Sequence, residues 1–296
     1  MKPTAILAAA ALFAAATPAA AQRDFNWAGQ VPAGSTLRVY TQNGTVTVRQ
    51  SGDGRARVHG ETVNAESGEI RYLTGGGSGG DFRVCAVRGE DATCGENGIR
   101  NNNDRGWGRR ERRGRANFTV EVPRGVLVRV SSGNGDVAVD GATADVHASS
   151  GNGQVRVGNG AARVAASSGN GAVMVEGARG PVTASSGNGR VVVNAASGPV
   201  NASTGNGRIE VAMASLRGAG DMAFSSGNGS VTLRLPADFG ADLEATTGHG
   251  GIETDFPLQV RGRVSAHRMA GRIGGGGRRL TISTGNGSIY LRRGGS

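Results

Sequence analysis

The sequence predicts an all-β protein, a single-chain parallel β-solenoid whose rungs each contain two strands and about 18 residues. The first observation behind this prediction is a repeated tag, SSGNG or STGNG. It recurs with a spacing of 18 residues four times running, because its copies begin at Ser131, Ser149, Ser167, Ser185 and Ser203. Such regular self-similarity is typical of stacked repeat architectures.

The second observation is the apolar pattern within each repeat. If the first Ser of the tag is position one, the apolar residues fall at positions seven, nine, sixteen and eighteen. In the first repeat these are Val137, Val139, Val146 and Ala148. Alternation of β-branched residues with period two is typical of short, half-buried strands. Each repeat therefore contains two strands, and the tag forms the turn between them. Gly and Asn tolerate the positive φ of tight turns, which explains the tag without a ligand.

A single repeat cannot be stable by itself. Its few buried side chains contribute roughly 5–6 kcal/mol, whereas ordering the backbone costs about 1–2 kcal/mol per residue. Stacking shares hydrogen bonds and apolar faces between copies and reverses this balance. Equivalent strands then lie parallel, about 4.8 Å apart, and right-handed winding is expected for parallel crossovers.

The N-terminus has the pattern of a secretory signal peptide over residues 1–21. Lys2 precedes an apolar run from Ala5 to Ala16, and Ala19 to Ala21 form a small-residue cleavage site. The apolar run is too short to span a bilayer comfortably, and no later stretch resembles a transmembrane segment. We therefore expect an exported protein, periplasmic or on the cell surface of a bacterium.

The rest of the chain divides into three regions. Residues 22–51 are expected to form an N-terminal cap and a first, diverged rung, since Leu37, Val39, Val46 and Val48 match the repeat. Residues 52–115 interrupt the pattern with β-hairpins and an Arg-rich loop. Residues 116–296 form the solenoid domain. Its C-terminal rungs are irregular, with insertions at 212–221 and 254–279 that project from the stack or close it, and the final strand lies at 283–292.

The run VPRGVLVRVSSGNGDVAVDG and the SSGNGxVxV repeats that follow resemble the bacterial toast-rack family, adhesin-like β-strand-repeat proteins of unknown function. The resemblance covers residues 35–50 and 116–292. It implies an exported or surface-attached solenoid with a role in adhesion or envelope stress. It brings no catalytic residues, and the chain differs from many members in its Arg-rich insertion and in lacking a membrane anchor.

The charge of the chain points to anionic partners. The formal net charge of +10 falls to +9 without Lys2, the only lysine, so arginine carries it. Basic exported proteins associate with anionic glycans, lipopolysaccharide or lipids; coding bias is the alternative explanation. The candidate binding residues lie in one segment and are Arg105, Trp107, Arg109, Arg110, Arg112, Arg113 and Arg115. Guanidinium groups pair with phosphate or carboxylate, and the alternative is a solvated surface loop. Nucleic acid is not expected as a partner.

Two further features have structural explanations. Cys85 and Cys94 are expected to form a local disulfide in an oxidising compartment. Stacked tags place one Asn per rung in a column, where side-chain amides can hydrogen-bond as a ladder. The column contains Asn134, Asn152, Asn170, Asn188 and Asn206.

Catalytic and metal chemistry is not supported by the pattern. GGGSGG places Ser78 in a G-x-S-x-G match, yet no helical pattern follows it. Position six of the repeat holds Asp136 but later Arg190, which opposes a calcium column. No ladder of carboxylates or aromatic platform of a polysaccharide enzyme occurs on the outward positions. We therefore expect no cofactor and no metal, and a non-enzymatic structural or interaction protein of the envelope. A binder of anionic glycan, lipopolysaccharide or lipid and, third, a solenoid carbohydrate enzyme are the alternatives.

Overall fold

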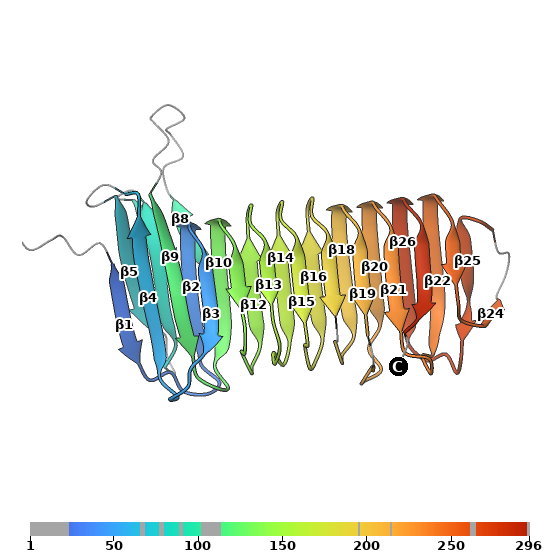
Figure 1. Ribbon diagram of the computed structural model, residues 1–296, viewed down its shortest axis with the longest axis horizontal. Helices are drawn as coiled ribbons and strands as arrows, with labels where there is room; N and C mark the ends of the chain where they lie inside the picture. The colour runs from blue at the N-terminus through green and yellow to red at the C-terminus, as the bar shows by residue number, and fades with distance from the viewer. Residues whose placement is uncertain are drawn as a thin grey trace, which may run out of the picture.

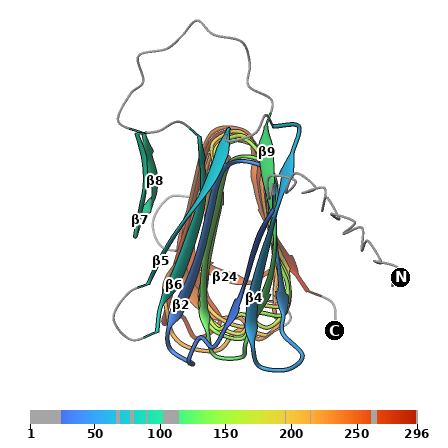
Figure 2. The ribbon, with the colours of Figure 1, turned by 90° about the vertical axis from the view of Figure 1, so that its left-hand side faces the viewer.

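The computed structural model describes residues 24–65, 69–76, 80–88, 91–101, 114–194, 196–213, 215–260 and 265–294. Within these ranges the chain forms strands and turns and no helix. Two long sheets face each other and run the length of the molecule (Figure 1), and Figure 2 shows the narrow space between them end-on. The predicted all-β solenoid is confirmed. The signal-peptide residues 1–21 lie outside the described residues.

The sheet nearer the viewer in Figure 1, called sheet A, has twelve strands. In spatial order they are β1 (Phe25–Gly29), β4 (Ala56–Val63), β9 (Arg115–Val122), β3 (Val46–Gln50), β11 (Val137–Val139), β13 (Val155–Val157), β15 (Val173–Glu176), β17 (Val191–Asn194), β19 (Ile209–Ala212), β21 (Val231–Leu235), β27 (Ile289–Arg293) and β23 (Ile252–Thr254).

The opposite sheet, called sheet B, has thirteen strands, and a separate two-stranded hairpin lies outside it. The strands of sheet B are β24 (Leu258–Val260), β25 (Arg268–Ile273), β22 (Ala241–His249), β26 (Arg279–Asn286), β20 (Met222–Asn228), β18 (Val200–Asn206), β16 (Val182–Ser186), β14 (Val164–Ser168), β12 (Val146–Ser150), β10 (Leu127–Asn134), β2 (Thr36–Asn43), β6 (Phe82–Arg88) and β5 (Ile70–Gly76). The hairpin consists of β7 (Ala92–Gly95) and β8 (Gly98–Asn101).

The sequence repeat sets the strand register. Strand β12 pairs in parallel with β14 so that Val146 lies opposite Val164, and β13 pairs with β15 so that Val155 lies opposite Val173. Each rung therefore runs up sheet B, turns through the tag and runs down sheet A (Figure 1). Val173 is 0% exposed and contributes to a core of stacked valines and alanines between the sheets.

The tag is required by contacts between successive rungs. The buried Ser168 hydroxyl donates to the carbonyl oxygen of Gly153 at 2.7 Å and accepts from the amide of Gly171 at 2.8 Å. A Cβ on Gly171 would lie only 2.1 Å from that same Gly153 oxygen. Neither Gly153, Gly171 nor Asn170 has a positive φ in the left-handed region. The expectation that positive φ explains the tag is therefore wrong for these central rungs, where glycine is needed because two backbones approach closely.

Both ends of the solenoid depart from the simple order of the chain. At the C-terminal end, β26 and β27 lie between the rung of β20 and β21 and the rung of β22 and β23. The last strand is therefore inserted within sheet A and does not form its edge. At the other end, β4 and β9 extend sheet A, while β5 and β6 extend sheet B. Within residues 52–115, which were expected to hold β-hairpins and a loop, β4, β5 and β6 extend the two sheets, and β7 and β8 form the separate hairpin.

The predicted disulfide is confirmed. Cys85 on β6 and Cys94 on β7 are bonded, with their Cα atoms 5.8 Å apart. The bond fixes the hairpin β7–β8 to the outer face of sheet B, where Figure 2 shows it outside the two-sheet stack. Beneath it Tyr40, Cys85 and Val87 form a small apolar cluster with Ala92. Among the described residues near the N-terminal end, this hairpin is the only element that projects from the outer face of sheet B.

Candidate anion-binding groove

The Arg-rich segment predicted to bind anions lies almost entirely outside the described residues. This holds for Arg105, Trp107, Arg109, Arg110, Arg112 and Arg113. Arg115 is described; it is the first residue of β9 and is exposed. Ser78 also lies outside the described residues. The structure therefore offers no geometry for the predicted site beyond Arg115.

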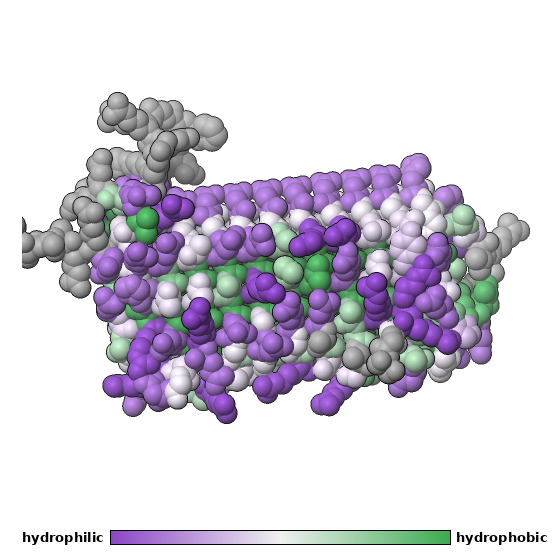
Figure 3. Space-filling view, viewed as in Figure 1, coloured by the Kyte–Doolittle hydropathy of each residue, from purple (hydrophilic) through white to green (hydrophobic). Residues whose placement is uncertain are grey.

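The asparagine column has its amides engaged in stacking hydrogen bonds. Each Nδ2 donates to the Oδ1 of the preceding rung: Asn152 to Asn134 at 2.5 Å, Asn170 to Asn152 at 2.6 Å, Asn188 to Asn170 at 2.7 Å and Asn206 to Asn188 at 2.8 Å. Asn228 and Asn286 continue the column. In Figure 3 this edge is the regular hydrophilic row along the top of the molecule. Its amide groups hold neighbouring rungs together.

Metal-binding geometry is absent from the described part of the chain, where no group of three or more His, Cys, Asp or Glu residues could hold an ion. In the same ranges no helix is long and apolar enough to cross a membrane.

On the outer face of sheet A, arginines are paired with nearby carboxylates. Arg156 contacts Glu176 at 3.0 Å, and Arg208 contacts Glu210 at 2.7 Å. The same face shows hydrophilic and hydrophobic side chains mixed along its length (Figure 3). Arg156 and Arg208 therefore each have a carboxylate partner on this face.

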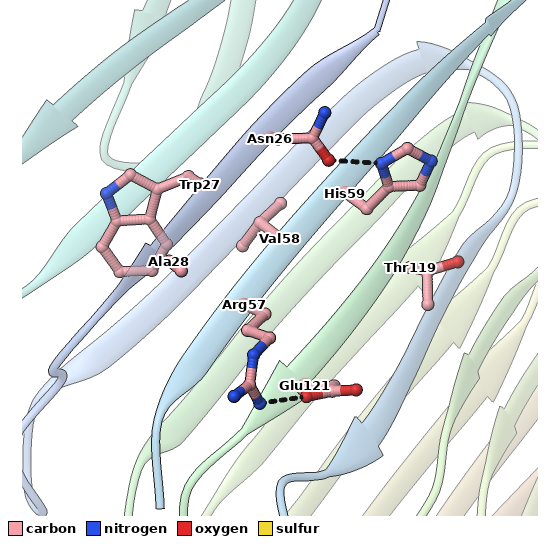
Figure 4. A pocket seen from close by; sticks show the side chains of 8 residues that line it. All are labelled: Asn26, Trp27, Ala28, Arg57, Val58, His59, Thr119 and Glu121. Atoms are coloured by element: carbon pink, nitrogen blue, oxygen red, sulfur yellow. Dashed lines mark hydrogen bonds and ion pairs between the residues drawn. The ribbon is translucent and has the colours of Figure 1, made fainter.

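A pocket of about 470 Å³ lies at the N-terminal end of sheet A, across β1, β4 and β9 (Figure 4). His59 Nδ1 lies 2.7 Å from Asn26 Oδ1, and Arg57 donates to Glu121 at 2.6 Å. Arg57 also pairs with Asp53; these hydrogen bonds raise the pKa of Arg57 and lower that of Asp53. The polar groups of this pocket bind one another, so it contains no charge directed at a ligand.

The outer face of sheet B has a different pattern, a line of basic residues across four adjacent strands, three arginines and one histidine. Arg83 on β6 is in register with Arg38 on β2, Arg38 with Arg129 on β10, and Arg129 with His147 on β12. We call these four residues the cationic row. Neighbouring strands are about 4.8 Å apart. Like charges directly opposite one another destabilise a sheet, so the row has an energetic cost that needs an explanation.

Little negative charge compensates the cationic row. Arg38 pairs with Asp81 at 2.7 Å, and this bond lowers the pKa of that carboxyl. The Nε atoms of Arg38 and Arg83 are buried and have no hydrogen-bond partner among the described residues. A buried donor without a partner costs about 1–3 kcal/mol. The repulsion between neighbouring guanidinium groups is the part of this cost that an anion on the outer face would reduce.

Arg83 has room to lie along the surface because its neighbour on β5 is a glycine. Gly75 is in register with Arg83, and a Cβ on Gly75 would meet an Arg83 guanidinium nitrogen at 2.7 Å. On the other side of the row, burial raises the pKa of the Tyr40 hydroxyl, while the charge and hydrogen bond of Arg129 oppose that shift. Tyr40 thus stays protonated, and its hydroxyl donates to the carbonyl oxygen of Glu96 at 2.8 Å.

A groove of about 310 Å³ adjoins the cationic row on the outer face of sheet B. At one end is the hairpin turn at Asn97, which the Tyr40–Glu96 bond and the disulfide hold in place. Arg129 and His147 line the groove next to the hairpin, and the small residues of later rungs line the rest. These are Ser131, Ser149, Ala165, Ser167, Thr183 and Ser185.

Part of this site is encoded in the repeat, although the sequence analysis above does not identify it. Arg38, Arg129 and His147 all occupy position seventeen of their rungs, between the inward residues at sixteen and eighteen. That shared position predicts an outward row. No such signal existed for Arg83, because β6 has no tag and its place beside β2 is fixed only in the folded structure.

The fold is a two-sheet β-solenoid, and the described residues contain no recognisable catalytic centre. Residues 34–292 match the Toastrack DUF4097 family, and the chain belongs to that family. The resemblance found in the sequence is thereby confirmed. No curated protein matches the chain.

Two solved structures are similar to the chain at low identity. One, from Bacteroides fragilis, is described as a "putative adhesin"; it has 13% identity and a TM-score of 0.45, and the match covers 91% of this chain and 97% of that one. The other, from Clostridium sporogenes, is described as a "putative cell adhesion protein", with 11% identity, a TM-score of 0.26 and coverage of 91% and 99%.

Proposed function

We propose that the protein is an exported, non-enzymatic interaction protein of the bacterial envelope, and that it binds an anionic glycan or lipid component through sheet B. The observation that carries this proposal is the cationic row, in which Arg83, Arg38 and Arg129 lie in register and Asp81 is the only carboxylate paired with them among the described residues. Export is inferred from the signal-peptide pattern of residues 1–21 and accords with the disulfide.

Arginine is suited to this role. Its guanidinium offers a rigid fork of donors that matches carboxylate and phosphate, and it stays charged at every physiological pH. A row of such groups also attracts anions from a distance in a salt-dependent way. Membership of an adhesin-like family supports a structural or interaction role and provides no catalytic residues.

The Arg-rich segment from Arg105 to Arg115 stays a second predicted contributor. Its described flanks, Asn101 on β8 and Gly114 before β9, lie at the tag edge of the stack. β8 belongs to the hairpin whose turn at Asn97 forms one end of the groove.

The experiment compares retention on immobilised lipopolysaccharide and on a heparin-like resin across a salt gradient. The row variant carries Arg83→Gln and Arg129→Gln, which keeps Arg38 and its Asp81 partner. The control carries Arg156→Gln and Arg208→Gln, two arginines of sheet A. We expect the row variant to elute at clearly lower salt and the control to elute near the unmodified protein. Equal elution of all three would overturn the proposal.

A third variant separates the row from the segment. Replacing Arg109, Arg110, Arg112 and Arg113 by Gln while keeping the row should weaken retention less than the row variant does. If retention depends on the Arg-rich segment alone, the binding site lies in that segment and the cationic row has no part in it. Turnover of any acidic polysaccharide by the protein would contradict the non-enzymatic assignment.

A further inference from the structure

We infer that the groove on sheet B binds a linear acidic oligosaccharide that lies along the long axis of the solenoid, with its carboxylates at the cationic row and its hydroxyls over a line of serines. The inference rests on the proposed function and adds to it the ligand class and its orientation.

The line of serines supplies the second half of the site. Ser131, Ser149, Ser167 and Ser185 occupy position one of successive rungs and are in register across β10, β12, β14 and β16. We call them the serine track. Unlike the buried second serines of the tags, they lie on the outer face and are half-buried. In the described part of the chain their hydroxyls have no hydrogen-bond partner, so each can both donate and accept toward a ligand.

The dimensions of the groove fit an extended chain that crosses the strands. From Tyr40 on β2 to Ser185 on β16 the groove spans four inter-strand steps, or roughly 19 Å at about 4.8 Å each. The floor is low because Ala165 and the serines have short side chains. On β10 and β12, the two strands that they share, the row and the track are two residues apart, about 7 Å, so a single chain can contact both.

The distribution of charge favours an acidic sugar over the other anionic polymers. The basic residues of the lining, Arg129 and His147, lie only at the hairpin end, and the rest of the groove offers hydroxyls and small side chains. A nucleic acid would place phosphates along the whole groove and would need aromatic side chains for its bases; none of the exposed lining residues is aromatic, and Tyr40 is 3% exposed. Acyl chains of a lipid would need an apolar cavity, which this hydroxyl-lined groove does not provide. An oligosaccharide with few carboxylates and many hydroxyls matches both the basic end of the groove and the serine track.

The hairpin gives the groove one closed end. Asn97 lies at that end, and the turn is held by the Tyr40 hydroxyl and by the Cys85–Cys94 disulfide. The other end is open along the serine track toward β18 and β20. An oligosaccharide therefore binds with one end against the hairpin and extends along later rungs, so longer chains gain contacts until the groove is filled.

The test measures, by calorimetry, the binding of oligosaccharides of increasing length that carry a single galacturonate at one end, with neutral malto-oligosaccharides as the control ligands. The unmodified protein should bind the acidic series with an affinity that rises at least tenfold from the monomer to a plateau, and should not bind the neutral series. Three variants are compared: Arg129→Gln removes a cation of the row, Ala165→Trp fills the groove, and Ala138→Trp adds the same bulk to the outer face of sheet A. Thermal melting confirms that each is folded.

The expected results differ for each variant. Arg129→Gln weakens the binding of every acidic oligomer, Ala165→Trp removes the gain with length while the monomer still binds, and Ala138→Trp leaves both properties unchanged. If Ala165→Trp keeps the gain with length, or if neutral oligomers bind equally well, the inference is wrong while binding at the row stands. If Arg129→Gln also has no effect, the proposed function fails with it.

Discussion

The hydroxyl of Ser168 donates a hydrogen bond of 2.7 Å to the carbonyl oxygen of Gly153, one rung earlier in the stack. It also accepts from the amide of Gly171, and Ser168 is 6% exposed. Replacing it by Ala leaves a half-buried carbonyl and a half-buried amide without this partner, which costs about 1–3 kcal/mol. The neighbouring Ser167 lies on the outer face. We expect Ser168→Ala to lower the urea midpoint clearly and Ser167→Ala to change it little. Equal midpoints would show that the second serine of the tag is dispensable.

Glycine at position five of the tag is required by the close approach of two rungs. A Cβ on Gly171 would lie 2.1 Å from the Gly153 oxygen and 2.4 Å from its carbonyl carbon. Both atoms belong to the backbone of a stacked rung and cannot move aside without separating the rungs. We expect Gly171→Ala to cost several kcal/mol, at the upper end of single substitutions. Gly52→Ala is the control, because nothing lies within 4 Å of a Cβ there. Matching thermal melting curves would refute the steric explanation.

Adjacent residues on one strand should respond in opposite ways to the same charge. Val173 is 0% exposed in the core, whereas Met174 points outward next to Arg156 of the preceding rung. A carboxylate at position 173 would be buried without a partner, at a cost of several kcal/mol. We expect Val173→Asp to prevent stable folding and Met174→Asp to be tolerated, as measured by circular dichroism and secreted yield. Similar behaviour of both variants would contradict the assignment of inner and outer faces.

The central rungs could be predicted because the tag and the apolar positions recur at a constant spacing of 18 residues. Once Ser149 lies beside Ser131, the spacing determines that Val155 stacks on Val137 and Asn152 on Asn134, and the structure has these pairs in register. A half-buried strand has a period of two, so the inward face followed from the same pattern. Local repetition therefore determines the rungs and their register.

The order of rungs at the ends could not be predicted in this way. Strand β26 lies beside β20, although β22 comes between them in the chain, and β6 lies beside β2. A repeat specifies which residues are equivalent but does not specify which equivalent copy is the spatial neighbour. The cationic row combines both cases. Arg38 and Arg129 share a repeat position, whereas Arg83 joins them only through the pairing of β6 with β2.

The pH dependence of ligand binding should report on His147, the last member of the row. Partial burial lowers its pKa from 6.5, the charges of Arg129 and Arg163 lower it further, and Asp145 opposes them. In the free protein His147 is therefore neutral at pH 7. A bound carboxylate favours the protonated ring and raises its pKa, so binding takes up a proton and the affinity increases as the pH falls below 6.5.

The stability of the free protein should change in the opposite direction. A histidine whose pKa is lowered by folding stabilises the folded state above its unfolded pKa of 6.5, and this contribution is lost as the pH falls below that value. Acid therefore weakens the fold slightly while it strengthens binding, so the two effects can be separated. We expect affinity for an acidic oligosaccharide, measured between about pH 5 and pH 8, to rise on acidification in the unmodified protein. The rise should disappear in His147→Gln, and identical pH profiles for the two proteins would exclude His147 from the site.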